Sequence, residues 1–328
     1  MATTTMTMAK ALNEGLRRAM EENKRVLIMG EDVGKLGGVF RITDGLQKDF
    51  GEDRVIDSPL AESAIVGTAV GLSIRGYRPV CEIQFDGFVY PAFDQIVSQV
   101  AKLHKRSDGV YTMSLVIRLP FQGGIGAIEH HSESPEAYFA HTAGLRVVSC
   151  ATPEDAYWMI QQSINHDDPI IFCEPKCRYW EKGEVDTERP PRGLFDAVVR
   201  RPGSDVTVVG YGASVRTMLR AAEAAESEGL SLEVIDARSI APLDLDTMAA
   251  SLEKTGRLVV VHEAPHTASI GSEIVSSLTE RCFYSLRAPG LQVSGYHTPY
   301  PPSRLEEEYR PSVDRILDAV DRVMEFES

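Results

Sequence analysis

The sequence predicts an α/β protein with a doubly wound, mostly parallel sheet, followed by a second, smaller α/β domain. Two observations support this prediction. Short apolar runs alternate with amphipathic stretches of helix length from residue 26 to residue 175. The alternation stops in a stretch rich in proline and glycine and resumes at Val206. We therefore expect a first domain over residues 1–185, a linker over 186–203 and a second domain over 204–328.

Strands are expected where short apolar runs are bounded by turn residues, and helices where apolar residues recur every three or four positions. In the first domain the expected strands are 26–29, 54–56, 78–85, 115–119, 145–149 and 170–173. The expected helices there are 9–23, 61–74, 91–105, 134–141 and 153–165. In the second domain, strands are expected at 206–209, 232–236 and 258–262, and helices at 215–228, 244–253 and 269–280. Strands that are joined through helices pair in parallel, which is the basis of the predicted sheet.

The composition excludes several functional classes. The formal net charge of −14, with no basic run to offset it, argues against a nucleic-acid surface. No apolar run reaches the roughly 18 residues of a membrane helix, and the first residues lack the features of a secretory signal. Five cysteines do not suit a disulfide framework, and Cys173 and Cys177 have no second pair nearby for a zinc site. Reduced thiols indicate a cytoplasmic protein with no membrane partner.

The connection between the second and third expected strands carries the first candidate site. Ser58 and Pro59 form a helix-start pattern, which places Glu62 in the first turn of the next helix. A carboxylate there is either a favourable charge at a helix N-terminus or a functional acid at a strand-to-helix junction, where α/β sheets bind ligands. Gly67 and Gly71 share one helix face and indicate a close backbone approach, for instance to an identical helix of a partner.

Glycine-rich loops follow two of the expected strands. The loop 30–40 lacks the Lys-Ser/Thr of a phosphate-binding loop and the spacing of a dinucleotide fingerprint, so a packed connection is favoured there. The loop 123–127 leads into His130 and His131, which have no third ligand at metal spacing. The two histidines are either ordinary loop residues or, because imidazole titrates near neutrality, proton donors to a reaction intermediate.

Several segments resemble one enzyme family. Glu62, Gly67 and Gly71, behind Ser-Pro-Leu-Ala, resemble the pyrimidine-side motif of thiamine-diphosphate enzymes. This chain is similar to the beta subunit of the decarboxylating component of 2-oxo acid dehydrogenase complexes. The similar segments are 82–97, 126–141, 262–265 and 295–301. The resemblance implies a thiamine-diphosphate pyrimidine-type first domain and a transketolase-C-terminal-like second domain. Glu-Ile-Gln-Phe at 82–85 and Phe-Ala-His at 139–141 favour the branched-chain member over the pyruvate member.

The resemblance also implies residue roles. Glu62 would hydrogen-bond a ring nitrogen of the cofactor's aminopyrimidine, on which Phe88 would stack. Leu60 and Gln84 would line the same pocket. His131 would assist proton transfer while the acyl group passes to lipoamide, whereas the preceding histidine matches the double-histidine version of the motif without a defined role.

Half of the cofactor site is missing from the chain. Gly-Asp-Gly with a downstream asparagine, which holds magnesium and diphosphate in this enzyme class, occurs nowhere in the sequence. The family supplies it from a separate alpha subunit, so the resemblance implies an α2β2 heterotetramer that contains a second beta subunit. It also implies a monovalent-cation site, for potassium, near Leu115, Ser163, His166 and Asp168, in which His166 departs from the usual acid.

The expected function is that of a beta subunit that decarboxylates branched-chain 2-oxo acids and passes the acyl group to the lipoyl domain of a dihydrolipoyl acyltransferase. Pyruvate or acetoin dehydrogenase is the alternative within the family. A non-catalytic assembly subunit is the alternative from another class, and Glu62 together with His131 argues against it. A nucleotide-binding oxidoreductase is disfavoured because no dinucleotide fingerprint follows the first strand.

Overall fold

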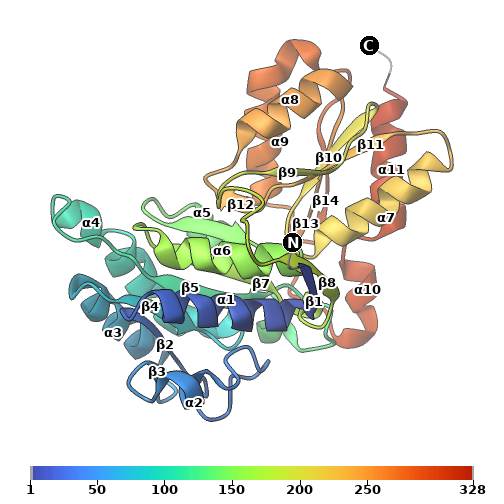
Figure 1. The fold of residues 1–328 in the computed structure, drawn as a ribbon. Helices are drawn as coiled ribbons and strands as arrows, with labels where there is room; N and C mark the ends of the chain where they lie inside the picture. The colour runs from blue at the N-terminus through green and yellow to red at the C-terminus, as the bar shows by residue number, and fades with distance from the viewer. Residues whose placement is uncertain (1–2, 327–328) are drawn as a thin grey trace. The chain divides into compact units, whose positions relative to one another are not determined.

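The computed structural model describes residues 3–326, which form two compact units. The first unit comprises the chain up to Phe121 together with Tyr138–Leu194, and the second comprises Gln122–Ala137 together with the chain from Phe195 onward. Figure 1 shows the course of the chain through each unit. Residues 1–2 of the first predicted domain and residues 327–328 of the second lie outside the described residues. A short segment from the middle of the chain thus belongs to the second unit.

A parallel sheet with the strand order β6-β7-β5-β4-β2-β3 is the centre of the first unit. All neighbouring pairs in this run are parallel. The strands are β2 (Val26–Gly30), β3 (Val55–Asp57), β4 (Arg78–Glu82), β5 (Val116–Phe121), β6 (Arg146–Ser149) and β7 (Ile170–Pro175). Every residue of β2, β5 and β7 is buried, as expected for strands that are covered on both faces. The predicted parallel α/β layer is therefore confirmed.

Helices cover this sheet. On one side, α1 (Met8–Glu22) and α6 (Pro153–Asn165) pack against each other (Figure 1). Gly15 permits their close approach, because a Cβ there would lie 2.6 Å from Cγ2 of Ile160. Elsewhere α3 (Glu62–Ile74) packs against β4 and against two irregular helical segments, η1 (Asp86–Ala92) and η2 (Gln95–Val100). Short helices complete the middle of the chain: α2 (Leu46–Phe50), α4 (Leu103–Arg106) and α5 (Glu136–Ala140).

The predicted start of the third helix at Ser58 and Pro59 is wrong. The helix begins at Glu62, with Ala61 as its N-cap and no capping side chain. The reason is that the Ser58 N–H donates to the carbonyl of Gly30 at 2.8 Å, so Ser58 still continues the pairing of β3 with β2. Glu62 nevertheless lies in the first turn, as expected.

The predicted single helix 91–105 is also wrong. Pro91, which has no N–H to donate, lies inside the 3₁₀ segment η1, and a π-helical turn, η2, follows before α4 begins. In this turn the N–H of Ala101 donates to the carbonyl of Ile96, five residues earlier. Ile96 and Val100 are nevertheless buried, as apolar residues at helical spacing would be.

The predicted linker contains regular structure. Within the predicted linker, β9 (Val198–Arg201) pairs antiparallel with β11 (Leu232–Asp236). Strand β8 (Lys182–Asp186) ends where the predicted linker begins. β8 pairs antiparallel with an unexpected N-terminal strand, β1 (Thr3–Thr7). Only Val185 of β8 is buried. A ribbon that buries so little shows no apolar alternation, which is why the sequence did not predict it.

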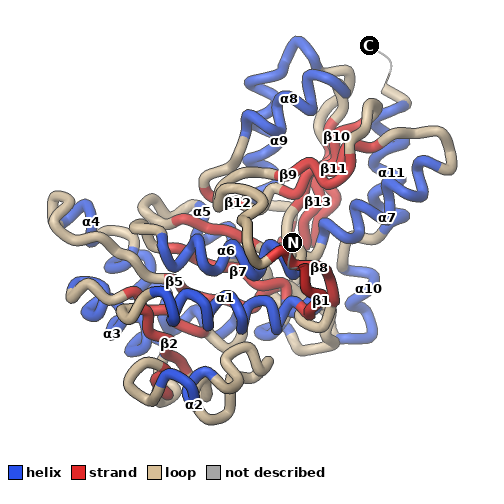
Figure 2. The backbone as a smooth tube through the Cα atoms, in the orientation of Figure 1, coloured by secondary structure: helices blue, strands red, loops and turns tan. Residues whose placement is uncertain are grey.

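The second unit contains a five-stranded sheet with the order β14-β13-β10-β11-β9, in which β9 is the antiparallel edge. Helices α7 and α11 pack together on one face and α8 and α9 on the other (Figure 2). The other strands of this sheet are β10 (Val206–Gly210), β13 (Leu258–Pro265) and β14 (Leu291–Gly295), and the short strand β12 (Ser239–Ala241) lies outside it. The helices are α7 (Ser214–Glu226), α8 (Leu245–Thr255), α9 (Ile270–Cys282), α10 (Glu306–Tyr309) and α11 (Val313–Met324). The elements after α9 were not predicted.

Candidate active site

Three neighbouring strands of the first unit end at one edge of the sheet, and the residues that follow them lie together there. Glu31 follows β2, Leu60 comes after β3 and Gln84 after β4, and these strands are adjacent in the order β4-β2-β3. Glu62 begins α3 directly beside this edge. The carboxyl ends of parallel strands are where α/β sheets bind ligands.

Glu62 is a buried carboxylate at a helix N-terminus. Its residue is 8% exposed, and the first turn of α3 provides a favourable field for its negative charge. Burial raises the pKa of the Glu31 carboxyl group, and the charges of Asp32 and Glu62 raise it further. The Glu31 carboxyl group therefore lies in an environment that favours its protonated form or a hydrogen-bond donor beside it.

Apolar, amide and aromatic groups lie at the same edge. Leu60 is 72% exposed, so its side chain is available for contact. Gln84 is half-buried, and its amide nitrogen donates to the carbonyl of Glu31 at 3.4 Å. Phe88 lies in η1, which packs against α3, and its ring meets that of Phe85 edge-on with centroids 6.1 Å apart. A carboxylate, an amide and an aromatic ring at one edge can bind a planar nitrogen heterocycle.

A layer of buried charges lies within the sheet. Arg118, in β5, donates to both oxygens of Glu174, at 2.7 and 2.9 Å, and to Glu82 at 2.5 Å. Burial lowers the pKa of Arg118, but the charges of Glu174 and Glu82 outweigh this effect and raise it. The Tyr179 hydroxyl donates to Glu174 at 2.7 Å. Because Glu82 ends β4, two residues before Gln84, this network fixes the strand end that carries a predicted site residue.

A second buried ion pair fixes η1. Lys176 Nζ lies 2.7 Å from Oδ1 of Asp86, and neither side chain is exposed. Asp86 is the first residue of η1, the segment that carries Phe88. Sequence reasoning missed both networks. The signal that could have found them is a charged residue inside an apolar strand, as in Val-Ile-Arg118-Leu, which demands a buried counter-charge.

The predicted proton donor His131 belongs to the second unit. It ends the short 3₁₀ segment η3 (Glu129–His131), and its Nδ1 lies 2.8 Å from the carbonyl of His130. Because a carbonyl can only accept, Nδ1 carries hydrogen in this contact, and Nε2 is the other ring nitrogen. The rings of His130 and His131 meet edge-on, with centroids 4.4 Å apart. Packing between the rings restricts the orientation of His131.

The residues predicted to hold a monovalent cation lie at the opposite ends of the strands. Leu115 directly precedes β5, and Ser163, His166 and Asp168 precede β7. The Ser163 carbonyl accepts from the N–H of His166 at 3.2 Å, and the Nδ1 atom of His166 accepts from the N–H of Asp168 at 3.0 Å. The structure therefore gathers Ser163, His166 and Asp168 at one turn, and neither they nor Leu115 lie at the edge that carries Glu62.

A guanidinium group lies at this turn. Arg78 donates to the carbonyls of Ile164 and His166, at 2.9 Å each, and pairs with Asp167 at 2.7 Å. A positive side chain thus already compensates these carbonyl oxygens. Across residues 3–326, no group of three His, Cys, Asp or Glu side chains is arranged to hold a metal ion. Over the same range, none of the helices has both the length and the apolar character needed to cross a membrane.

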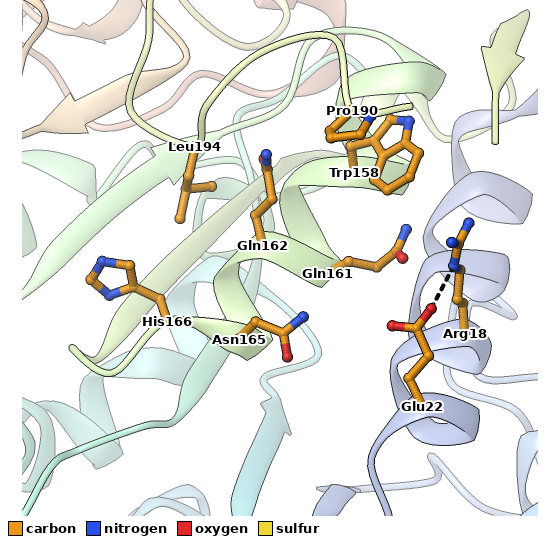
Figure 3. Close-up of a pocket in the computed structure, with 9 residues that line it drawn as sticks. All are labelled: Arg18, Glu22, Trp158, Gln161, Gln162, Asn165, His166, Pro190 and Leu194. Atoms are coloured by element: carbon orange, nitrogen blue, oxygen red, sulfur yellow. Dashed lines mark hydrogen bonds and ion pairs between the residues drawn. The ribbon is translucent and has the colours of Figure 1, made fainter. Parts of the chain in front are cut away.

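A pocket of about 380 Å³ opens on the first unit between α1 and α6 (Figure 3). Its floor is rich in amide side chains, and an ion pair of 2.8 Å between Arg18 and Glu22 borders it. The other lining residues are Trp158, Gln161, Gln162, Asn165, His166, Pro190 and Leu194. None of the predicted cofactor-binding residues lines this pocket, so it does not mark the candidate active site.

Two protein families match the chain. The family described as "Transketolase, pyrimidine binding domain" matches residues 4–180, and the family described as "Transketolase, C-terminal domain" matches residues 196–316. Among solved structures, "Split gene transketolase, inactive beta4 tetramer" is similar, with a TM-score of 0.81 over 98% of this chain and 99% of that one. Its 20% sequence identity shows a shared fold. The predicted two-domain α/β fold is confirmed.

Relatives match almost the full length of the chain. "Pyruvate dehydrogenase E1 component subunit beta" of Leifsonia xyli is 58% identical over 97% of this chain and 95% of its own. "3-methyl-2-oxobutanoate dehydrogenase subunit beta" of Mycobacterium tuberculosis is 54% identical over 98% and 93%, respectively. The pyruvate dehydrogenase subunit of Bacillus subtilis is 44% identical over 98% and 99%. Together with the two family matches, these similarities confirm the resemblance found in the sequence: the chain belongs to the family of thiamine-diphosphate-dependent 2-oxo acid dehydrogenase beta subunits.

Proposed function

We propose that this subunit decarboxylates branched-chain 2-oxo acids and transfers the resulting acyl group to the lipoyl domain of a dihydrolipoyl acyltransferase. The observation that carries the proposal is the grouping of Glu62, Gln84 and Leu60 at the carboxyl ends of β2, β3 and β4. The segments Glu-Ile-Gln-Phe and Phe-Ala-His favour branched-chain substrates. A relative with 54% identity is named as a 3-methyl-2-oxobutanoate dehydrogenase subunit, which supports this choice.

The residues at this edge fit the pyrimidine half of thiamine diphosphate. When bound, this cofactor supplies the carbon nucleophile that attacks the 2-oxo group and accepts the electrons left by the departing carbon dioxide. Glu62, buried at the start of α3, would hydrogen-bond a ring nitrogen of the aminopyrimidine. Phe88 would stack on the ring, and Leu60 and Gln84 would line its pocket.

His131 acts in the second half-reaction. As the acyl carbon is oxidised, the lipoyl disulfide is reduced: one sulfur bonds the acyl carbon and the other takes a proton. An imidazole whose Nδ1 is held by a carbonyl can deliver that proton from Nε2. His131 is therefore assigned to acyl transfer rather than to decarboxylation.

The other half of the active site comes from a separate alpha subunit in an α2β2 heterotetramer. This assignment rests on the missing Gly-Asp-Gly pattern, because magnesium-bound diphosphate needs oxygen ligands. Further parts of the proposal are a potassium site near Leu115, Ser163, His166 and Asp168, domain boundaries at 185 and 204, and a cytoplasmic location. All five cysteines are free of disulfides, in keeping with a reducing compartment.

Pyruvate is the second candidate substrate, since a relative with 58% identity is named as a pyruvate dehydrogenase subunit. The chain should be co-expressed with its alpha subunit, and decarboxylation should be compared for 3-methyl-2-oxobutanoate and pyruvate, with carbon–carbon cleavage of acetoin measured as a separate reaction. We expect the branched-chain acid to give the highest kcat/KM, and a higher value for pyruvate would reverse the order of the two candidates. The chain without its partner should bind the cofactor weakly and show no turnover. Magnesium-dependent turnover by the chain alone would contradict the split site.

A further inference from the structure

We propose that Glu306 and Glu263 are positioning residues that hold the glycine loop ahead of His131, an inference that rests on the proposed role of His131 in acyl transfer. Both acids belong to the second unit, as does the loop. Glu306 begins α10, and Glu263 lies in β13. Glu263 is 3% exposed and Glu306 is 6% exposed, so neither acid serves as an ordinary surface charge.

Glu306 binds the loop through both carboxylate oxygens. Oε1 accepts from the N–H of Gly124 at 2.7 Å, and Oε2 accepts from the N–H of Gly126 at 3.0 Å. The Tyr300 hydroxyl donates to Oε1 at 2.9 Å. The acid therefore fixes two alternate peptide groups of the loop at once. Hydrogen bonds to an ionised carboxylate are about twice as strong as neutral ones.

Glu263 holds the base of the same loop. Its Oε1 accepts from the N–H of Gly123 at 2.5 Å, and its Oε2 accepts from Nε of Arg310 at 3.1 Å. Arg310 compensates the negative charge that the two buried acids bring to this region. The loop thus donates three backbone hydrogen bonds to two carboxylates.

The glycines are required by this contact. A Cβ at Gly123 would lie 1.8 Å from the hydroxyl oxygen of Tyr300 and 3.0 Å from Oε1 of Glu306. Gly124 has a φ of +90°, and a Cβ there would lie 2.8 Å from Cζ of Arg310. The Gly-Gly-x-Gly pattern, which otherwise invites a nucleotide interpretation, is explained by the close approach of these side chains.

Residues before and after the loop are also held by hydrogen bonds. Gln122 accepts from the N–H of Ala213 at 3.1 Å, and the Tyr211 hydroxyl donates to Glu136 at 2.7 Å. Between these anchors the chain is exposed at Ile128 and half-buried at His131. His131 is the residue of the second unit to which the proposed function assigns a chemical step. The buried acids therefore set the backbone path of the segment that carries it.

A carboxylate-to-amide change tests the role of Glu306, because an amide has one acceptor oxygen where the carboxylate has two. In Glu306→Gln one glycine N–H meets an NH₂ group and loses its acceptor. Hydrogen exchange of the amides of residues 123–132 should then be faster, most clearly at Gly124 and Gly126. Glu308→Gln, an exposed acid two residues away, is the matched control and should leave exchange unchanged.

Activity provides the second measurement, in the complete complex with the alpha subunit. We expect Glu306→Gln to lower acyl transfer to a lipoyl domain about tenfold, because a small displacement of a catalytic group is costly. Decarboxylation with an artificial electron acceptor should stay within about twofold, since it does not use His131. Should Glu306→Gln not fold, Glu263→Gln gives the same test through Gly123.

Unchanged exchange at Gly124 and Gly126 would overturn the proposal, as would equal losses in the two half-reactions. The proposed function has a separate test, because a wild-type complex that transfers no acyl group to the lipoyl domain would contradict it directly. The exchange measurement needs no activity. Faster exchange in Glu306→Gln would therefore still show that Glu306 holds the glycine loop, even if the complex transferred no acyl group.

Discussion

Arg118 and Glu174 form a two-bond ion pair in which neither side chain is exposed, with Nε and Nη2 of the arginine 2.7 and 2.9 Å from the carboxylate oxygens. Glu82 adds a third contact to the same guanidinium. Burial raises the pKa of Glu82, and Arg118 opposes this effect. Two buried carboxylates therefore share one cation, which makes Arg118 the critical member.

Arg118→Met should destabilise the first unit strongly. The substitution leaves Glu82 and Glu174 buried without their cation, for which the cost is about 3–5 kcal/mol. Urea unfolding at pH 7 gives the free energy, and Arg75→Met, at an exposed position, is the control. The loss should shrink at acidic pH, because the Glu82 carboxyl group, whose pKa burial raises, then becomes neutral. A pH-independent loss would contradict the charge argument.

Gly71→Ala should separate chain stability from assembly. A Cβ at Gly71 has no neighbour within 4 Å, so nothing within the chain requires glycine there. Alanine in a helix interior is favoured over glycine by about 1 kcal/mol. We expect the isolated chain to become more stable and the complex, measured by analytical ultracentrifugation, to dissociate more readily. If the Gly71→Ala complex dissociated no more readily than wild type, the interpretation that Gly67 and Gly71 face a partner would be contradicted.

His262 should make the stability of the second unit depend on pH. Burial lowers its pKa to about 4, although its hydrogen bond to Gln292 acts in the opposite direction. In the unfolded chain the ring takes a proton below about pH 6.5. The unfolded state thus binds more protons between these two values, and the free energy of unfolding falls as the pH drops.

The size of this effect can be measured with His262→Gln. Between pH 7 and pH 5 the wild-type chain should lose about 2 kcal/mol more than the variant in urea unfolding. His297→Gln, at an exposed position, should follow the wild-type slope. Equal slopes for wild type and His262→Gln would show that this ring is not held neutral.

Much of the fold could be predicted from local patterns, because buried parallel strands and amphipathic helices leave strong apolar spacing in the sequence. The helix 153–165 was predicted with its observed bounds, since Thr152 caps it and Pro153 starts it. Strands β8 and β9 lack such spacing, because few of their residues are buried. The π-helical turn at 95–100 shifts the hydrogen bonds without changing which residues are buried, so periodicity could not reveal it.

The candidate site could be predicted only where a motif is local. Glu62 and its glycines lie within ten residues of each other, and the motif identified them. Arg118 pairs with acids 36 and 56 residues away, and Gly124 with one 182 residues away. Such pairs follow from the topology of the sheets. The inclusion of residues 122–137 in the second unit has the same origin.

Glu62→Gln should preserve the fold and abolish most of the decarboxylation. The side chain lies at a helix start and the change is nearly isosteric, so the melting temperature should stay within about 2–4 °C of wild type. An amide cannot exchange a proton with the pyrimidine, and losing a general acid or base costs about 10²–10⁴ in rate. Turnover of the mutant complex near the wild-type value would restore the simpler interpretation of Glu62 as a charge at a helix N-terminus.

His131→Ala should separate the two half-reactions. In the proposed function, decarboxylation depends on the groups around Glu62, whereas acyl transfer needs a proton at the lipoyl sulfur, which is assigned to Nε2 of His131. We expect acyl transfer to a lipoyl domain to fall about 10²-fold or more, and decarboxylation with an artificial acceptor to change much less. His141→Ala, an exposed histidine ten residues away, is the control for surface effects. Equal losses in both assays, at unchanged cofactor affinity, would show that His131 has no special part in the second step.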